Sequence, residues 1–408
     1  MAAALSFLPL GSPTIAGADR DDTIRQVRMG TLVVATTPGA EVRVEQLRHE
    51  FWFGAALANQ AFGTRMRTED RERYLSTFVV NFNAAVTENA LKWHAMEPLR
   101  GSIDYSTVDA ILAWTDKRGI PLRGHNVFWG VRNRVQAWLQ ALPDEQLRVT
   151  LQARAVDIAR RYHERFAEYD LNNEMLHGNY YEQRLGPDIT RDMAAWMRQE
   201  DPRAVLYLND YEIATGRRVE DYAKQIQKLL EQGVPLGGIG VQGHSHGDTF
   251  DPVALRQALD RLAEFKLPIR ITEFNFPGQH SKHYGKPGAK LTDEEEQAKA
   301  TALTDYYRIC FAHPAVEGIM MWGFWEGANW IPVSSLFRRD WSPTPAATAY
   351  RELVFKQWWT SAQAKADAAG RCEIRAFFGS HRVTAGGRET VVELRRKEPT
   401  KHVSLSSP

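Results

Sequence analysis

The segment from Glu168 to Glu174 reads EYDLNNE, and it ends an apolar run in two amides and a carboxylate. Leu171 belongs to the run, but asparagine disfavours strands and a buried glutamate must be paired or protonated. Two interpretations are open: a solvated loop, or a proton-transfer site at the mouth of a buried strand. The rest of the chain bears on this choice, because it repeats the pattern.

Short apolar or β-branched runs recur between residues 50 and 325. The runs are EFWFGAAL (50–57), NAAVTENA (83–90), PLRGHNVFW (121–129), EYDLNNE (168–174), AVLYLNDY (204–211), GIGVQGHSH (238–246), PIRITEFNF (268–276) and EGIMMWGFW (317–325). Segments with apolar residues at helical spacing lie between them, as at 68–82, 144–166, 219–232 and 252–265. Eight such alternations predict an α/β fold, a (β/α)8 TIM barrel over residues 49–360.

Polar or ionisable residues close nearly every run. They are Glu88, Asn89, His125, Asn173, Glu174, Asn209, Asp210, Gln242, His244, Glu273, Asn275, Trp322 and Glu326. A parallel barrel builds its active site from the carboxyl ends of its strands, so we expect these side chains to converge on one mouth.

The two ends of the chain have a different pattern. Residues 24–48 predict a β segment with a turn at Thr37-Pro38-Gly39, and residues 371–398 predict a hairpin around Gly386-Gly387. We expect the two segments to pair into a small β-module beside the barrel. Residues 1–18 contain a short apolar part and the run Ala16-Gly17-Ala18, which is typical of a signal peptide although no Lys or Arg precedes it, and this predicts a secreted or periplasmic protein.

Composition argues against several partners. Fifty-one Lys and Arg residues nearly balance 50 Asp and Glu, which gives no field for nucleic acid or an anionic membrane. No later apolar run approaches the roughly 20 residues of a membrane span. Twelve Trp residues suit stacking on sugar rings, although most Trp in any chain are core. We therefore expect a neutral polysaccharide or oligosaccharide as partner, and a monomer.

Neither a metal nor another cofactor is expected. Cys310 and Cys372 lie far apart and in no CxxC pattern, which leaves the redox compartment open. His244-Ser245-His246 resembles an HxH metal motif, but metallohydrolase barrels need further ligands from other strands, and the first run, EFWFGAAL, supplies no HxH.

Glu174 and Glu273 are the candidate catalytic pair. They close the fourth and seventh runs, whose strands are well separated around a closed ring. Two carboxyl groups facing each other suit glycosidic cleavage, in which one protonates the leaving oxygen and the other attacks the anomeric carbon. A single glutamate of this kind is more often a solvated or ion-paired loop residue.

The order of motifs resembles the family 10 glycoside hydrolases, the endo-β-1,4-xylanase family, over residues 51–358. The matching pieces are TENALKW (87–93), RGHNVFW (123–129), NNE (172–174), YLNDY (207–211), GVQGH (240–244), ITEFN (271–275) and MWGFWEGANW (321–330). Each is weak alone, but their order on successive strands is specific.

The resemblance implies a double-displacement, anomer-retaining mechanism with Glu174 as the general acid/base and Glu273 as the nucleophile. It implies that Asn173 donates to the sugar 2-hydroxyl, that Gln242 and His244 orient the nucleophile, and that Asn275 supports His244. It implies sugar-binding positions at Glu88, Asn89, Lys92, His125, Trp129, Tyr211, Trp322 and Trp330. The ordinary alternatives are a surface cation for Lys92, core packing for the tryptophans and satisfied structural imidazoles for the histidines.

The chain departs from the family pattern at two places. Asn275 stands where the family usually has Asp, which replaces a charged partner of His244 with a neutral one. Gly130 follows Trp129 where the family commonly has His; we expect Gly130 to leave room and Arg132 to offer a cation, for a decorated xylan or another linkage. The basic loop 277–287 is expected either to line the leaving-group side or to be a solvated face.

The function expected is a retaining, endo-acting hydrolase of β-1,4-xylosidic bonds in xylan. The alternatives are a family 10 relative acting on another β-glycan or on short oligosaccharides, and a catalytically weak carbohydrate-binding barrel.

Overall fold

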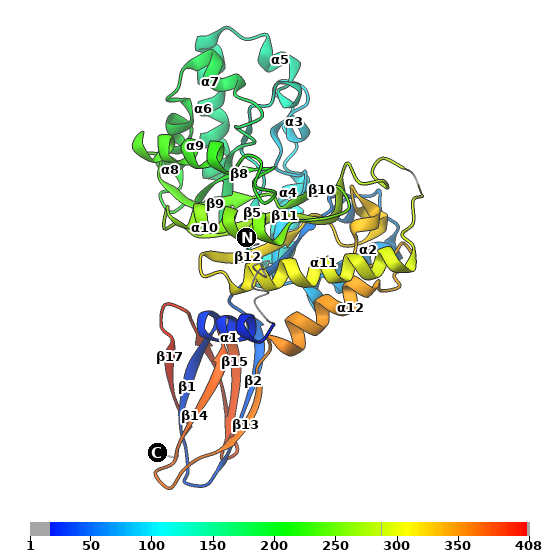
Figure 1. Ribbon diagram of the computed structural model, residues 1–408. Coiled ribbons are helices and arrows are strands. Elements are labelled where there is room, and N and C mark those ends of the chain that lie inside the picture. The colour runs from blue at the N-terminus through cyan, green and yellow to red at the C-terminus, as the bar shows by residue number, and fades with distance from the viewer. Residues whose placement is uncertain (1–16, 287, 406–408) are drawn as a thin grey trace, which may run out of the picture.

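The computed structural model describes residues 17–286 and 288–405, and Figure 1 shows that they form a barrel with a β-module at one end. The signal peptide predicted for residues 1–18 lies outside the described residues, except for its last two positions. Among the described residues, no helix is long and apolar enough to cross a membrane.

Parallel strands form a closed ring. In ring order they are β3 (Trp52–Leu57), β4 (Ala84–Thr87), β5 (Leu122–Gly124), β7 (Glu168–Asn173), β8 (Leu206–Asp210), β9 (Leu236–Val241), β11 (Ile269–Gln279) and β12 (Val316–Met321). The ring closes because β12 pairs with β3, and β11 pairs with both β9 and β12. The predicted eight-stranded TIM barrel is thereby confirmed. The short strands β6 (Phe128–Trp129) and β10 (His244–His246) extend the sheet at the carboxyl ends of β7 and β11.

Helices surround the ring. The longer ones are α2 (Thr68–Asn81), α4 (Ser106–Asp116), α6 (Asp144–Arg161), α8 (Ile189–Glu200), α9 (Val219–Glu231), α10 (Pro252–Ala263), α11 (Asp293–Ala312) and α12 (Pro345–Glu352). The short ones are α3 (Trp93–Met96), α5 (Ala137–Gln140), α7 (Tyr180–Leu185), the 3-10 turns η1 (Asn59–Phe62), η2 (Arg132–Arg134), η3 (Glu326–Ala328) and η4 (Pro332–Ser334), and the π-turn η5 (Leu353–Gln357). The four helical stretches predicted from periodicity correspond to α2, α6, α9 and α10. In α9 the buried residues Tyr222, Ala223, Ile226 and Leu229 share one face, as amphipathic spacing requires.

The barrel interior contains a buried charge network. Arg123 on β5 is fully buried and pairs with Glu168 and Asp170 on β7, while Arg270 on β11 donates to Glu168 from Nη2 at 2.8 Å. Burial alone would raise the pKa of Glu168, but Arg270 and Arg123 together lower it. Gly240 allows a close approach of β8 and of this network, because a Cβ there would lie 2.6 Å from the Leu208 carbonyl oxygen and 3.1 Å from the Arg123 guanidinium.

The β-module is a small sandwich of two sheets. One sheet orders β14 (Arg371–Phe377), β1 (Met29–Ala35) and β17 (Thr400–Ser404), and the other orders β13 (Ser361–Lys365), β2 (Glu41–His49), β15 (Gly379–Ala385) and β16 (Arg388–Leu394). The expected hairpin around Gly386 and Gly387 is formed by β15 and β16. Leu32 and Val34 from one sheet and Val42 and Val44 from the other belong to a separate apolar core.

The prediction of a β segment over residues 24–48 is wrong at its start. Residues up to Arg28 belong to the helix α1 (Gly17–Arg28), and the first strand begins at Met29. Ile24 is buried in the barrel core, while Arg28 donates to the carbonyls of Phe311, His313 and Val316 at 2.6 to 2.8 Å. This helix therefore covers the end of α11, a tertiary contact that strand propensity does not reveal.

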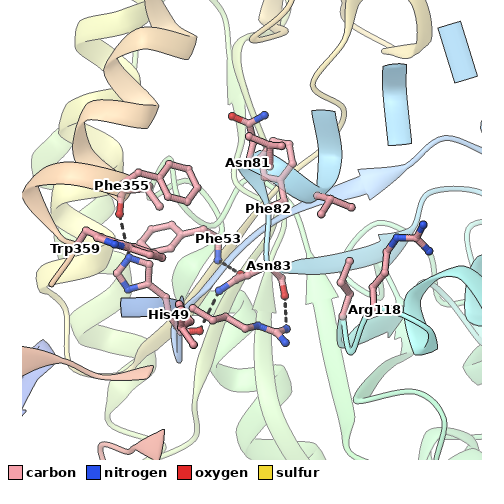
Figure 2. Close-up of a pocket in the computed structure, with 14 residues that line it drawn as sticks. His49, Phe53, Asn81, Phe82, Asn83, Arg118, Phe355 and Trp359 are labelled. Carbon is pink, nitrogen blue, oxygen red and sulfur yellow. Dashed lines mark hydrogen bonds between the residues drawn. The ribbon is translucent and has the colours of Figure 1, made fainter. Parts of the chain in front are cut away.

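The module lies at the end of the barrel opposite the mouth. Strand β2 ends at His49 and the barrel strand β3 begins at Trp52, so the connection joins the amino ends of the barrel strands. A cavity of about 190 Å³ lies at this junction, and Figure 2 shows Phe53, Phe82 and Trp359 around it. Asn83 donates there to the carbonyls of His49 and Phe51 and accepts from the amide of Phe53. The cavity lies at the amino ends of the barrel strands, so it is separate from the polar residues at their carboxyl ends.

Candidate active site

Glu174 directly follows β7, where the backbone turns out of the strand. Its φ of +57° lies in the left-handed region, and its amide donates to the carbonyl of Asn209 at 2.9 Å. The side chain accepts two hydrogen bonds, from Trp129 Nε1 and from Gln242 Nε2, both at 2.9 Å. A residue held in this sparsely populated conformation by several partners is typical of a functional position.

Burial raises the pKa of Glu174, and the negative charges of Glu273 and Asp210 act in the same direction. The hydrogen bonds from Gln242 and Trp129 oppose this shift but do not cancel it. Glu174 is therefore suited to hold a proton at a pH where an ordinary glutamate is ionised.

Glu273 lies on β11 and is buried among donors. Its Oε2 is 3.1 Å from His244 Nε2, and its Oε1 accepts from Asn209 Nδ2 at 2.8 Å. Burial alone would raise the pKa of Glu273, but the charge of His125, the hydrogen bond from His244 and the charge of Lys92 lower it to about 2. One mouth thus holds two carboxyl groups with opposite tendencies, the arrangement that assigns an acid and a nucleophile.

Asn209 joins the two strand ends. Its Nδ2 also donates to Asn173 Oδ1 at 3.0 Å, and its Oδ1 accepts from the Thr272 hydroxyl at 2.6 Å. Asn173 Nδ2 is left buried and without a hydrogen-bond partner among the described residues. A buried donor without a partner is costly, so this amide is available for a ligand acceptor. Sequence reasoning placed Asn209 at a strand end but gave it no role.

The strand-end positions of β4 and β5 lie close to Glu273. Lys92 donates to Asn89 Oδ1 at 2.9 Å, and its ammonium lies 4.9 Å from the Trp129 ring and 5.4 Å from the Trp322 ring. His125 Nδ1 lies 2.8 Å from Asp170 and 3.7 Å from Glu273. Burial raises the pKa of Glu88, which Lys92 partly offsets. Lys92 is buried, so it is not the surface cation of the alternative interpretation.

The aromatic residues differ in exposure. Trp322 is buried, with its ring edge-on to His125 at 5.0 Å, whereas Trp330 is 40% exposed and edge-on to His244 at 5.2 Å. Tyr211, after β8, stacks on His177 with ring centroids 3.6 Å apart. Of these three, Trp330 offers the greatest accessible surface to a ligand.

The role expected for Gln242 needs correction. It was predicted to orient the nucleophile Glu273, but its side chain donates to Glu174 instead. Gln242 contacts Glu273 only through the backbone, where its carbonyl accepts the Glu273 amide at 2.7 Å. Of the two side chains, only that of His244 contacts Glu273, and its Nδ1 lies 2.7 Å from Asn275 Oδ1, as expected for a neutral partner. Sequence spacing could not decide this, because Gln242 and His244 lie on either side of Gly243, whose φ is +74°.

The expectation that Gly130 leaves room is also wrong. A Cβ on Gly130 would lie 3.1 Å from the carbonyl of Gly178, and one on Gly178 would lie 2.3 Å from Val131 Cα. The loop after Glu174 therefore fills the space, and Tyr180 donates its amide to the Gly130 carbonyl at 3.0 Å. Arg132 is exposed and lies over the Tyr180 ring, 5.9 Å from its centroid.

The positive charge of the described part of the loop 277–287 is partly neutralised. Lys282 and His283 both pair with Glu295 at the start of α11. Tyr284 lies edge-on to Trp330 at 5.8 Å and connects this loop to the mouth.

No group of three or more His, Cys, Asp or Glu residues within 17–286 and 288–405 is arranged to hold a metal ion. In the segment His244-Ser245-His246, which resembles an HxH motif, His244 contacts Glu273 and Asn275, and His246 Nδ1 lies 3.7 Å from Glu212. Cys310 and Cys372 are free and buried.

A parallel (β/α)8 barrel with two buried carboxyl groups at its mouth, one with a raised and one with a lowered pKa, has the two-carboxylate arrangement of barrel glycosidases. The chain belongs to glycosyl hydrolase family 10, whose family model matches residues 45–353.

Comparisons with known proteins agree with this class. The chain is 36% identical over 349 residues to endo-1,4-beta-xylanase 1 of Arabidopsis thaliana, an alignment covering 85% of this chain and 34% of that protein. It is 32% identical over 369 residues to the anti-sigma-I factor RsgI6 of Acetivibrio thermocellus, covering 89% and 46%. The structure of xylanase 10B from Thermotoga maritima superposes with a TM-score of 0.66 at 24% identity, covering 76% of this chain and 96% of that one. The chain spans only about a third to a half of the length of these two curated relatives.

Proposed function

We propose that this chain is a retaining glycoside hydrolase that cleaves β-1,4-xylosidic bonds within xylan. The observation that carries the proposal is the pairing of Glu174, whose pKa burial raises, with Glu273, whose pKa the groups around it lower to about 2 against the effect of burial.

The first step uses both carboxyl groups in opposite roles. Glu273 attacks the anomeric carbon while Glu174 gives its proton to the departing glycosidic oxygen, so one C–O bond forms as another breaks. Once Glu273 is bound in the ester, its charge no longer acts on Glu174. Glu174 then takes a proton from water, which attacks the same carbon and releases Glu273 as a carboxylate.

Two neighbouring groups support the transition state. The Asn173 amide nitrogen is positioned to donate to the sugar 2-hydroxyl, where the hydrogen bond strengthens as positive charge develops on the ring. His244 and Asn209 hold the two oxygens of Glu273 at 3.1 and 2.8 Å, which fixes the direction of attack.

Xylan is the substrate class that the curated relatives support. The names of several relatives, from 27 to 36% identical, give endo-1,4-beta-xylanase activity. Lys92, Glu88 and Asn89 would contact hydroxyl groups on the non-leaving side, and Trp330 would provide an aromatic surface.

A carbohydrate-binding barrel without hydrolysis is the second candidate. The relative RsgI6 is named for regulation as an anti-sigma-I factor. Both carboxyl groups are retained here with opposite pKa shifts, which a protein that only binds sugar does not require.

The test compares wild type, Glu174→Ala and Glu273→Ala on xylan and on an aryl xylobioside. We expect reducing-sugar release by wild type, proton NMR showing the β-anomer as first product, and a rate fall of about 10⁴-fold or more in Glu273→Ala. Glu174→Ala should lose far more activity on xylan than on a substrate whose leaving group needs no proton. Xylan binding without release by wild type would identify the binding barrel instead.

We also propose that the protein is exported and monomeric. The resemblance of residues 1–18 to a signal peptide supports the first point. Cell fractionation and light scattering of the purified chain test the two points separately.

A further inference from the structure

His177 lies between two carboxylates beside the candidate acid Glu174. Its Nδ1 is 2.8 Å from Asp210 Oδ1, and its Nε2 is 3.4 Å from Glu212 Oε2. Carboxylates only accept hydrogen bonds, so a ring that contacts one on each side is favoured with both nitrogens protonated. Burial works against the charged ring, but Asp210 and Glu212 together raise the pKa of His177 above 6.5.

Asp210 ties this imidazole to the loop that carries Glu174. It is 1% exposed, and it accepts the backbone amides of Leu176 and Tyr211, both at 2.9 Å. These donors hold the Asp210 carboxylate in place, and burial, together with the negative charge of Asp210, raises the pKa of Glu174. The net charge of the His177–Asp210 pair therefore acts on the candidate acid Glu174.

Tyr211 covers one face of the His177 ring. The two rings are nearly parallel, 13° apart, with centroids separated by 3.6 Å. The His177 side chain is 15% exposed, so its interaction with Asp210 is only partly screened by water.

Other charged groups face this pair and the acid. Arg218 acts on His177, Arg217 and His246 act on Glu212, and Glu174 also faces Glu273 and Lys92. Of these groups, His177 alone combines a hydrogen bond to Asp210 with a place three residues after Glu174. A change in its charge therefore acts on Glu174 through Asp210.

We propose that the His177–Asp210 pair sets how readily Glu174 releases its proton, which makes His177 a positioning residue of the proposed reaction. Protonated His177 cancels part of the field that Asp210 exerts on Glu174. When His177 loses its proton, that field acts in full and Glu174 holds its own proton more firmly. The pair thus extends the pH range over which Glu174 can act as an acid, and the inference rests on the proposed function.

The alternative is a clamp that merely orders the loop after Glu174. If the pair were only a clamp, its loss would lower the rate and the stability but would leave the pH dependence of kcat/KM unchanged. The two roles are separated by the alkaline limb of kcat/KM, which reports the acid of the free enzyme.

The experiment measures that limb in His177→Gln, Asp210→Asn and the double variant. His177→Gln removes the positive charge and should move the limb to higher pH by roughly half to one unit. Asp210→Asn removes the negative charge and should move the limb to lower pH. The double variant should return near wild type. His313→Gln is the matched control, because His313 pairs with Asp260 at 3.3 Å at the end of α11, and it should leave the limb unchanged. A lower rate with an unmoved limb in both single variants would overturn the inference.

A second measurement follows Glu174 without substrate. Carbon-13 NMR of glutamate-labelled protein, assigned by difference from Glu174→Gln, gives the titration of Glu174 directly. If wild type does not hydrolyse xylan but the titration moves as stated, the proposed function fails and the charge coupling stands. If wild type hydrolyses xylan and the titration is unmoved, the coupling fails. Should His177→Gln not fold, the opposite shift expected in Asp210→Asn carries the test.

Discussion

Nδ1 of His244 lies 2.7 Å from the side-chain oxygen of Asn275, while its Nε2 contacts the candidate nucleophile Glu273. A neutral amide therefore orients the imidazole that holds Glu273. The resemblance described above predicts a carboxylate at this position, so the contact to His244 is kept and the negative charge is absent.

Asn275→Ala should slow formation of the glycosyl-enzyme, because the His244 ring loses its partner and its direction. Leaving a buried donor unpaired costs about 1–3 kcal/mol, so kcat/KM on an aryl xylobioside should fall roughly 5- to 150-fold. Asn275→Asp keeps an acceptor at the same place and should retain most of the activity. Equal losses in both variants would contradict the role given to this contact.

Gln242→Met should move the alkaline limb of kcat/KM upward, by roughly half a pH unit. The Gln242 hydrogen bond stabilises ionised Glu174, and its loss raises the pKa of that group further. The protonated acid then persists to higher pH. Gln227→Met, on the exposed face of α9, is the control. A shift of the acidic limb of kcat/KM instead would show that Gln242 acts on the nucleophile Glu273.

Glu273→Gln should change stability in a pH-dependent way. The pKa of Glu273 falls from its ordinary 4.5 to about 2 because His125, His244 and Lys92 outweigh the effect of burial. A lowered pKa stabilises the fold above pH 4.5, and this contribution is lost as pH falls toward 2. This contribution to the free energy of unfolding amounts to roughly 3 kcal/mol. Urea unfolding of wild type and variant between pH 2 and 6 measures it, and a constant difference across this range would refute it.

Arg28→Met should destabilise the junction between α1 and the barrel. Arg28 is buried, donates to three carbonyls, and lies 4.7 Å from the centroid of the Phe51 ring. Leaving these acceptors unpaired should cost roughly 3 kcal/mol in the free energy of unfolding. Arg25→Met, whose side chain is 67% exposed, should change it by no more than about 0.5 kcal/mol. Comparable unfolding midpoints for both variants would show that Arg28 does not stabilise the junction between α1 and the barrel.

The barrel could be predicted because its signals are local and repeated. Each strand run is short and apolar, each helix has a polar face, and the strand ends carry the polar residues. The order of EYDLNNE and ITEFN placed Glu174 directly after β7 and Glu273 on β11. The start of the chain was predicted less well, since Ile24 and Arg28 are helical through contacts with α11, which lies nearly 300 residues away in the sequence.

The sequence by itself determined the ring of strands and the identity of its two mouth glutamates, because hydrophobic periodicity and residue order are written along the chain. Only the tertiary structure decided which neighbour serves which carboxyl group. It turned Gln242 toward Glu174, joined Asn209 to Glu273 and placed His177 against Asp210. These pairings depend on side-chain direction across different strands, and hydrogen bonds and charge coupling act through distances that sequence spacing does not contain.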